Sequence, residues 1–98
     1  MTLQEIKARV IQLVLELFKN NGTDTKFIEY VDLVDDLGMD SITFISIIVE
    51  IESQFKIMIP DSLLLMDNFK HIDDIAVIIY RQLSNKAKEM EENINVEN

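Results

Sequence analysis

Cysteine is absent from the 98 residues, which excludes disulfide bonds, thiolate zinc sites, iron–sulfur clusters and a cysteine nucleophile. A single histidine leaves little material for general-base catalysis or for a histidine metal site. Two glycines and one proline are too few for the many turns of a small β-sandwich or barrel. No apolar run is long enough to span a membrane, and the first ten residues, MTLQEIKARV, do not resemble a signal peptide. We therefore expect a soluble cytoplasmic protein without membrane insertion.

Positive charge is also scarce, because nine lysines and arginines stand against 18 acidic residues, which gives a net charge of −9. This balance argues against binding to a nucleic-acid backbone. Residues 21–40 contain one lysine and six acidic residues, so much of the negative charge is concentrated there. Such a field would steer basic protein surfaces toward the segment, although a solvated acidic loop would have the same composition.

Three segments have the three- and four-residue spacing of apolar residues that is typical of amphipathic helices. They are residues 3–19, about 41–55 and about 72–83, and Thr2 is a plausible N-cap for the first. A long connection, residues 22–40, has no sustained period but contains too many apolar residues to stay in solvent. Pro60 ends the helical pattern and is followed by room for one short turn, residues 61–66. The pattern predicts an all-α bundle of three main helices and one short helix, with a long first loop.

The predicted domain covers residues 1–83, and the polar remainder, residues 84–98, is either a frayed helical extension or a disordered tail. We expect a monomer. Because the chain begins with Met and has no flanking domain, we expect a free-standing protein and not a domain of a larger synthase.

Candidate metal ligands are few. Asp35, Asp36 and Asp40 suggest cation binding, but the spacing does not match the calcium loop of a helix–loop–helix site, since Gly38 falls at the wrong place. His71 precedes the last predicted helix and has no cysteine to pair with, which favours a capping or surface role. We therefore predict no specific metal site, and leave weak, diffuse binding of divalent cations open.

The informative residue is Ser41, at the start of the second predicted helix. It follows Gly38, which suits a tight turn, and Asp40. A serine at this place is usually an N-cap whose hydroxyl satisfies a backbone amide. The same hydroxyl would project beside the positive end of the helix dipole, where a phosphoester is favoured.

The segment VDDLGMDSI, residues 34–42, resembles the Leu-Gly-x-Asp-Ser-Leu attachment motif of acyl carrier proteins. The resemblance covers roughly residues 3–83, and its further matching positions are Phe55, Ile59, Pro60, Asp61, Phe69, Ile72, Ile75, Ala76 and Ile79. It implies that Ser41 carries 4′-phosphopantetheine, derived from coenzyme A, with Gly38 and Asp40 as motif residues. It also implies a carrier and not an enzyme, which holds acyl or aminoacyl groups as thioesters. The implied partners are a phosphopantetheinyl transferase and acyl-loading and acyl-processing enzymes.

The chain departs from the fatty-acid-synthesis members of that family on its second helix. Thr43, Ser46, Ser53 and Gln54 stand where acidic residues are usual, as in carriers of specialised or peptide-synthesis pathways. The cargo therefore stays open between fatty acyl, polyketide and aminoacyl groups. Two further alternatives are an unmodified acidic module for protein interaction and a small hydrolase, for which the sequence offers no nucleophile–base set.

Two groups of residues are predicted to bind partners. On a helical projection Ile47, Ile51 and Phe55 account for the core, which leaves a second apolar set beside Ser41. This set is Ile42, Ile45 and Val49. We expect it to be at least partly exposed, unless Phe27, Ile28 or Leu33 of the long connection covers it. The second group is Asp35 and Asp36, whose charge would speed the encounter with basic partners.

Overall fold

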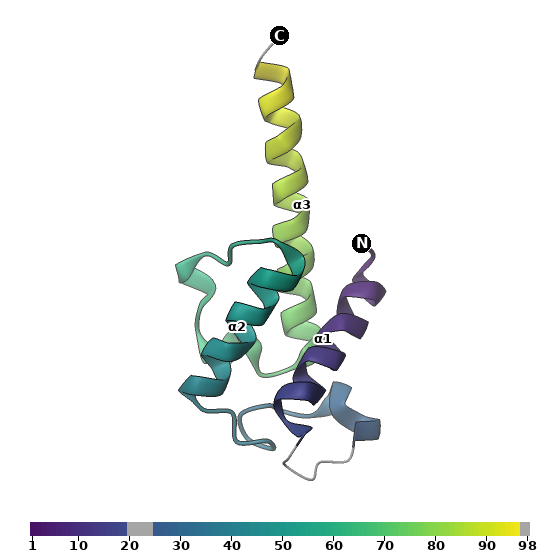
Figure 1. Cartoon of the computed structure of the whole chain (residues 1–98), viewed down its shortest axis with the longest axis vertical. Helices are drawn as coiled ribbons and strands as arrows, with labels where there is room; N and C mark the ends of the chain where they lie inside the picture. The colour runs from purple at the N-terminus through teal and green to yellow at the C-terminus, as the bar shows by residue number, and fades with distance from the viewer. Residues whose placement is uncertain (20–24, 97–98) are drawn as a thin grey trace.

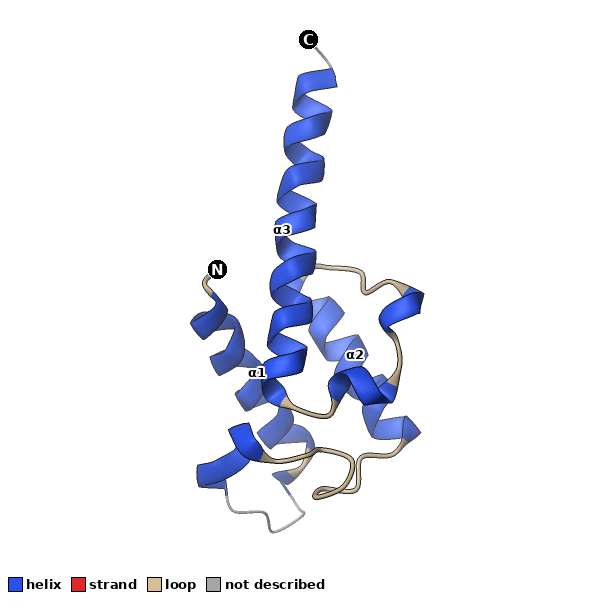
Figure 2. Ribbon diagram, turned by 180° about the vertical axis from the view of Figure 1, so that it is seen from behind, coloured by secondary structure: helices blue, strands red, loops and turns tan. Residues whose placement is uncertain are grey.

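The computed structural model describes residues 1–19 and 25–96, which form three α-helices joined by loops and short 3-10 helices (Figure 1). Helix α1 spans Leu3–Leu17, α2 spans Ser41–Phe55 and α3 spans Ile72–Val96. The 3-10 helices are η2 (Thr25–Tyr30), η3 (Asp61–Leu63) and η4 (Met66–Phe69). No strand occurs in the described ranges, and Figure 2 shows only helices and loops there. The expected all-α bundle with three main helices and a long first loop is confirmed.

The start of α1 follows from the sequence. Thr2 is the N-cap and forms a capping box with Glu5, because the threonine hydroxyl accepts from the Glu5 amide at 3.2 Å and the Glu5 carboxylate accepts from the Thr2 amide at 3.2 Å. The helix ends at Leu17, before the stop expected near residue 19.

One stripe of each helix forms the core, and this is what fixes the bundle. The apolar residues of each stripe recur at three- or four-residue steps, so they can all be buried on one side only if the segment is helical. This burial outweighs the low helix propensity of the β-branched residues. The buried residues of α1 are Ile6, Val10, Leu13 and Val14; those of α2 are Ile47, Ile48, Ile51 and Phe55; those of α3 include Ile72, Ile75, Ala76 and Ile79. The predicted core positions of α2 are confirmed.

The long connection packs against the bundle, as expected. Ile28, Leu33, Leu37 and Met39 are buried in the same core as the helices. Lys7 of α1 adds a polar tie, because its ammonium lies 3.1 Å from the Glu29 carboxylate of η2 and 2.9 Å from the carboxylate of Asp73 in α3.

The segment after α2 differs from the prediction of one short turn at residues 61–66. The chain leaves α2 at Lys56, which adopts the left-handed conformation with φ 56°. It then forms two 3-10 helices, η3 and η4, because Leu65 between them is extended (φ −116°, ψ 132°) and interrupts the turn. Phe69 at the end of η4 is buried and packs edge-on against Phe44, with ring centroids 5.3 Å apart.

Helix α3 is longer than predicted and projects beyond α1 and α2 (Figures 1 and 2). The helix boundary expected near Leu83 is wrong, and of the two alternatives for the residues after it, the helical extension is present as far as Val96. No glycine or proline follows Ile72, and so nothing in the sequence breaks the helix. The Lys86 ammonium also donates to the Lys56 carbonyl at 2.6 Å, which ties this extension to the end of α2. Residues 97 and 98 of the predicted tail lie outside the described residues.

Candidate functional site

Ser41 is the first residue of α2, and Asp40 takes the N-cap position before it. The Asp40 carboxylate accepts from the Thr43 amide at 2.8 Å, and the Asp40 carbonyl accepts from the Phe44 amide at 2.9 Å. Ser41 is exposed, and its hydroxyl makes no hydrogen bond to any described residue. The alternative in which Ser41 is only an N-cap is therefore wrong.

The charge beside Ser41 is fixed by this cap. Hydrogen bonds from the backbone amide of Thr43 and then from its hydroxyl hold the pKa of Asp40 below its ordinary value of 3.8. The carboxylate is therefore ionised at neutral pH and oriented toward the helix. The Ser41 hydroxyl stands next to it at the positive end of the α2 dipole.

Gly38 ends the turn that leads into the site. Its amide donates to the Val34 carbonyl at 3.0 Å, which is the αL pattern of a helical C-terminus, and the Met39 amide donates to the Leu33 carbonyl at 2.9 Å. Gly38 has φ +68°, and a Cβ built on it would meet nothing within 4 Å. Glycine is thus required by the backbone conformation and not by lack of space. Leu33 and Met39 are both buried in the core and anchor the turn.

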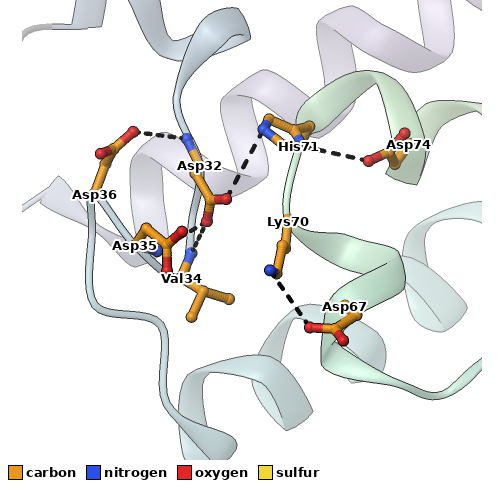
Figure 3. A network of polar contacts seen from close by, with 8 residues as sticks. All are labelled: Asp32, Val34, Asp35, Asp36, Asp67, Lys70, His71 and Asp74. Carbon is orange, nitrogen blue, oxygen red and sulfur yellow. Dashed lines mark hydrogen bonds and ion pairs between the residues drawn. The ribbon is translucent and has the colours of Figure 1, made fainter.

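Asp32 begins the same turn, a role that the sequence patterns did not predict. Its carboxylate accepts from the amides of Val34 at 2.9 Å and Asp35 at 2.8 Å, and the Asp36 carboxylate accepts in return from the Asp32 amide at 2.9 Å (Figure 3). These bonds, that of Asp35 first, lower the pKa of Asp32. The sequence did contain a signal for this cap. An aspartate can accept from the amides two and three residues after it, and here a glycine follows at the end of the same turn.

The turn is joined to the start of α3 by one backbone bond and by His71, whose contacts are drawn in Figure 3. The Leu33 amide donates to the Lys70 carbonyl at 2.7 Å. The His71 ring lies between two carboxylates, with Nδ1 3.4 Å from Asp74 and Nε2 4.0 Å from Asp32. The predicted surface role of His71 agrees with its half-exposed side chain, which contacts a residue of the first turn of α3.

The predicted acidic docking residues differ in their contacts. Asp35 and Asp36 are both exposed. The Asp36 carboxylate is engaged in the turn, whereas that of Asp35 has no partner among the described residues. Among residues 1–19 and 28–88, whose side chains the structure describes, no three acidic or histidine side chains converge as a metal site would require.

Ile42, Ile45 and Val49 form the α2 shoulder, and the structure leaves them open. They are 76%, 59% and 56% exposed. Ile28 and Leu33 are buried in the core and do not cover them, and the side chain of Phe27 lies outside the described residues. The predicted exposure is confirmed.

Charge on α2 is sparse, as the sequence indicated. Its two ionisable residues are Glu50 and Glu52, and Glu52 accepts from the Ile59 amide at 3.0 Å. One of the two acids is therefore occupied by the loop that follows the helix. The exposed side chains that α2 itself presents beside Ser41 are apolar and not acidic.

Comparison with known proteins places these features in a family. A family model described as phosphopantetheine attachment site matches residues 8–77, which include α2 and the turn before it. Among the described residues, no helix is long and apolar enough to cross a membrane.

Two curated relatives are similar to this chain. "Acyl carrier protein 3, mitochondrial" of Arabidopsis thaliana is 33% identical over 85 residues, which cover 87% of this chain and 62% of that protein. "Acyl carrier protein" of Phytoplasma mali (strain AT) is 39% identical over 54 residues, which cover 55% of this chain and 62% of that protein. The matches thus span less than two thirds of the length of each relative.

Proposed function

Because the chain belongs to the acyl carrier protein family, whose members are carriers and not enzymes, we propose that Ser41 is the residue that bears its 4′-phosphopantetheine. The observation that carries this proposal is that the N-cap of α2 and the exposed hydroxyl are supplied by two different residues. Asp40 caps the helix, so the Ser41 hydroxyl is exposed and free of hydrogen bonds within the described residues. The Ser46 hydroxyl, about one turn further along α2, differs from that of Ser41 because it donates a hydrogen bond to the Ile42 carbonyl at 3.1 Å.

The residues around Ser41 suit the prosthetic group. A phosphodiester on this hydroxyl would lie at the N-terminus of α2, where the helix dipole favours negative charge. Gly38 and Asp40 would act indirectly, by setting the direction in which the chain enters the helix. When attached, 4′-phosphopantetheine supplies the terminal thiol that a chain without cysteine lacks.

The proposed role is to hold acyl or aminoacyl groups as thioesters and to deliver them to biosynthetic enzymes. Tethering the cargo makes each transfer intramolecular within a docked complex, which raises its effective concentration. The proposed partners are a phosphopantetheinyl transferase and enzymes that load or process the acyl group. The apolar α2 surface favours a specialised or peptide-synthesis pathway, and fatty-acid and polyketide cargo remain within the proposal.

We propose the α2 shoulder as the main docking surface, with Asp35 and Asp36 contributing to encounter. A contiguous set of exposed apolar side chains beside the modified residue is typical of a protein-interaction site. We also propose a cytoplasmic monomer. The mitochondrial designation in one relative's name applies to that relative.

Incubation with coenzyme A and a broad-specificity phosphopantetheinyl transferase tests the assignment of Ser41. Intact-mass spectrometry should show one added phosphopantetheine on the wild type and on Ser46→Ala, and none on Ser41→Ala. An unmodified wild type, or modification that persists in Ser41→Ala, would contradict the proposal.

An unmodified interaction module is the second candidate, and the exposed α2 shoulder is the observation that favours it. Such a module would dock partners without a prosthetic group. The intact mass of the protein isolated from its native cells, with thioesters preserved, separates the two candidates. A mass equal to that of the bare chain would support the module, and an added arm with cargo would also identify the acyl group.

A further inference from the structure

A groove of about 550 Å³ lies at the opposite end of α2 from Ser41, between the loop after α2 and the middle of α3. The loop contributes Lys56, Ile57, Met58 and Pro60, and α3 contributes Gln82, Asn85 and Lys86. Both ends of α2 and the loop beside α3 are visible in Figure 1. A helix of 15 residues is about 22 Å long, so the groove is well separated from Ser41.

The charge of the groove is opposite to that of the chain. Its two charged lining residues are lysines, although acidic residues outnumber basic ones by 18 to nine in the sequence. The Lys86 ammonium is held at the groove by its 2.6 Å bond to the Lys56 carbonyl, which leaves further donor hydrogens unused. The Lys56 ammonium is exposed and has no partner among the described residues.

The floor of the groove is apolar. Met58 is 80% exposed and Pro60 is exposed, while Ile57 of the same lining is buried. The amide and carbonyl of Met58 make no hydrogen bond to the described residues. Capping of α2 explains the Lys86 bond to Lys56. It explains neither the exposed methionine nor the second, unpaired lysine.

We propose that this groove binds an extended acidic peptide segment of a partner protein. Acidic side chains of the segment would pair with Lys56 and Lys86, and one apolar side chain would pack on Met58 and Pro60. The main-chain groups of Met58 and the amide side chains of Gln82 and Asn85 supply hydrogen bonds that suit a peptide backbone. A segment bound here leaves Ser41 accessible, so one partner can hold the protein while another acts at the start of α2.

Titration of the full-length ¹⁵N-labelled protein with a short synthetic peptide tests this proposal. The peptide consists of aspartate and glutamate residues around a central Leu-Phe pair. Amide chemical shifts should change around Met58 and Asn85 and remain constant around Ser41. Lys56→Gln and Met58→Ser should each weaken binding about fivefold, in keeping with the loss of one exposed ion pair or apolar contact.

Lys88→Gln is the matched control, because Lys88 is exposed on the same helix and does not line the groove. It should leave the affinity unchanged, and so should Ser41→Ala, which separates this result from the modification of Ser41. Equal weakening by Lys88→Gln, or the absence of shifts at the groove, would overturn the proposal. Shifts with laurate but not with the peptide would also overturn it, since the groove would then bind a small amphiphile.

Discussion

Two aspartates, Asp32 and Asp40, each begin a helical turn by accepting hydrogen bonds from backbone amides ahead of them. The first turn ends at Gly38 and the second is the start of α2. Asp40 is exposed and Asp32 is half-buried, and each carboxylate is oriented by its bonds and has a lowered pKa. The position of Ser41 therefore depends on two side chains that do not touch its hydroxyl.

The lowered pKa of Asp40 predicts a dependence of stability on acid. A carboxyl group whose pKa is lower in the folded protein stabilises the fold above its unfolded value, near 3.8. This contribution is lost as the pH falls through the lower folded value. Asparagine can accept the same bond without titrating, so Asp40→Asn should lose stability less steeply than the wild type below pH 3.8. Urea unfolding at a series of acidic pH values measures the difference.

Asp61→Asn provides the control for this prediction. Its carboxylate accepts no hydrogen bond from the described residues, so removing it should leave the acid dependence as in the wild type. Parallel pH profiles for the wild type and Asp40→Asn would contradict the role given to the Asp40 cap.

Gly38 predicts a stability cost that arises from the backbone alone. With φ +68° and no atom near a built Cβ, Gly38→Ala should reduce the free energy of unfolding by about 1 kcal/mol without a steric clash. Gly38→Asn should cost less, because asparagine tolerates the left-handed conformation better. Equal costs for the two variants in urea unfolding would show that conformation is not the cause.

Helix α2 has two apolar faces: one is buried in the core, and the other, the α2 shoulder, is exposed. Ile45 lies on the exposed face, so the substitution Ile45→Asp should leave helicity and thermal stability nearly unchanged. It should reduce the rate of Ser41 modification by about tenfold or more, as the loss of a central apolar contact does. Circular dichroism and the transferase assay measure the two effects.

Ser53→Asp adds the same charge at an exposed position of α2 outside the shoulder. It should be modified at close to the wild-type rate. If Ile45→Asp unfolds the domain, Ile45 belongs to the core; if both variants are modified equally well, docking occurs elsewhere.

Helical periodicity was enough to predict α1, α2 and the core of the bundle, because burial of one stripe per helix decides the fold. The turn at Gly38 was predicted for a similar reason, since glycine has a local signature. The cap was not predicted, because the capping preference pointed to Ser41 and Asp40 holds that position; the role of Ser41 was predicted from the family resemblance. The role of Asp32 was not predicted, because the aspartates of this segment were considered as metal ligands and partner-binding residues and not as caps of a turn. The length of α3 stayed open between a helical extension and a disordered tail, because the polar sequence after Leu83 does not predict the bond from Lys86 to Lys56.

Over the whole molecule, negative charge gathers near the N-terminal end of α2, and the groove at the other end presents lysines. Asp35 is the acidic residue of the turn whose carboxylate is free among the described residues. Asp35→Asn should therefore slow association with a phosphopantetheinyl transferase at low salt and flatten its salt dependence. Stopped-flow measurements over a range of salt concentrations test this expectation.

Asp61→Asn is again the matched variant, since it removes one exposed carboxylate from the loop after α2. It should change the association rate less than Asp35→Asn does. Asp36→Asn is less suitable, because it would also replace the charged acceptor of the Asp32 amide by a neutral one. If Asp35→Asn associates with the transferase at the wild-type rate at low salt, Asp35 has no electrostatic role in the encounter.

The bond from the Leu33 amide to the Lys70 carbonyl also has a consequence for hydrogen exchange. The amides of Gly38 and Met39 are bonded within their own turn, so their deuterium uptake reports on the opening of that turn. The Leu33 amide is bonded across the chain, and its uptake reports on the separation of the turn from α3. Comparing deuterium uptake at the three amides with and without a docked enzyme would therefore distinguish a turn that unfolds from one that separates from α3 while it stays folded.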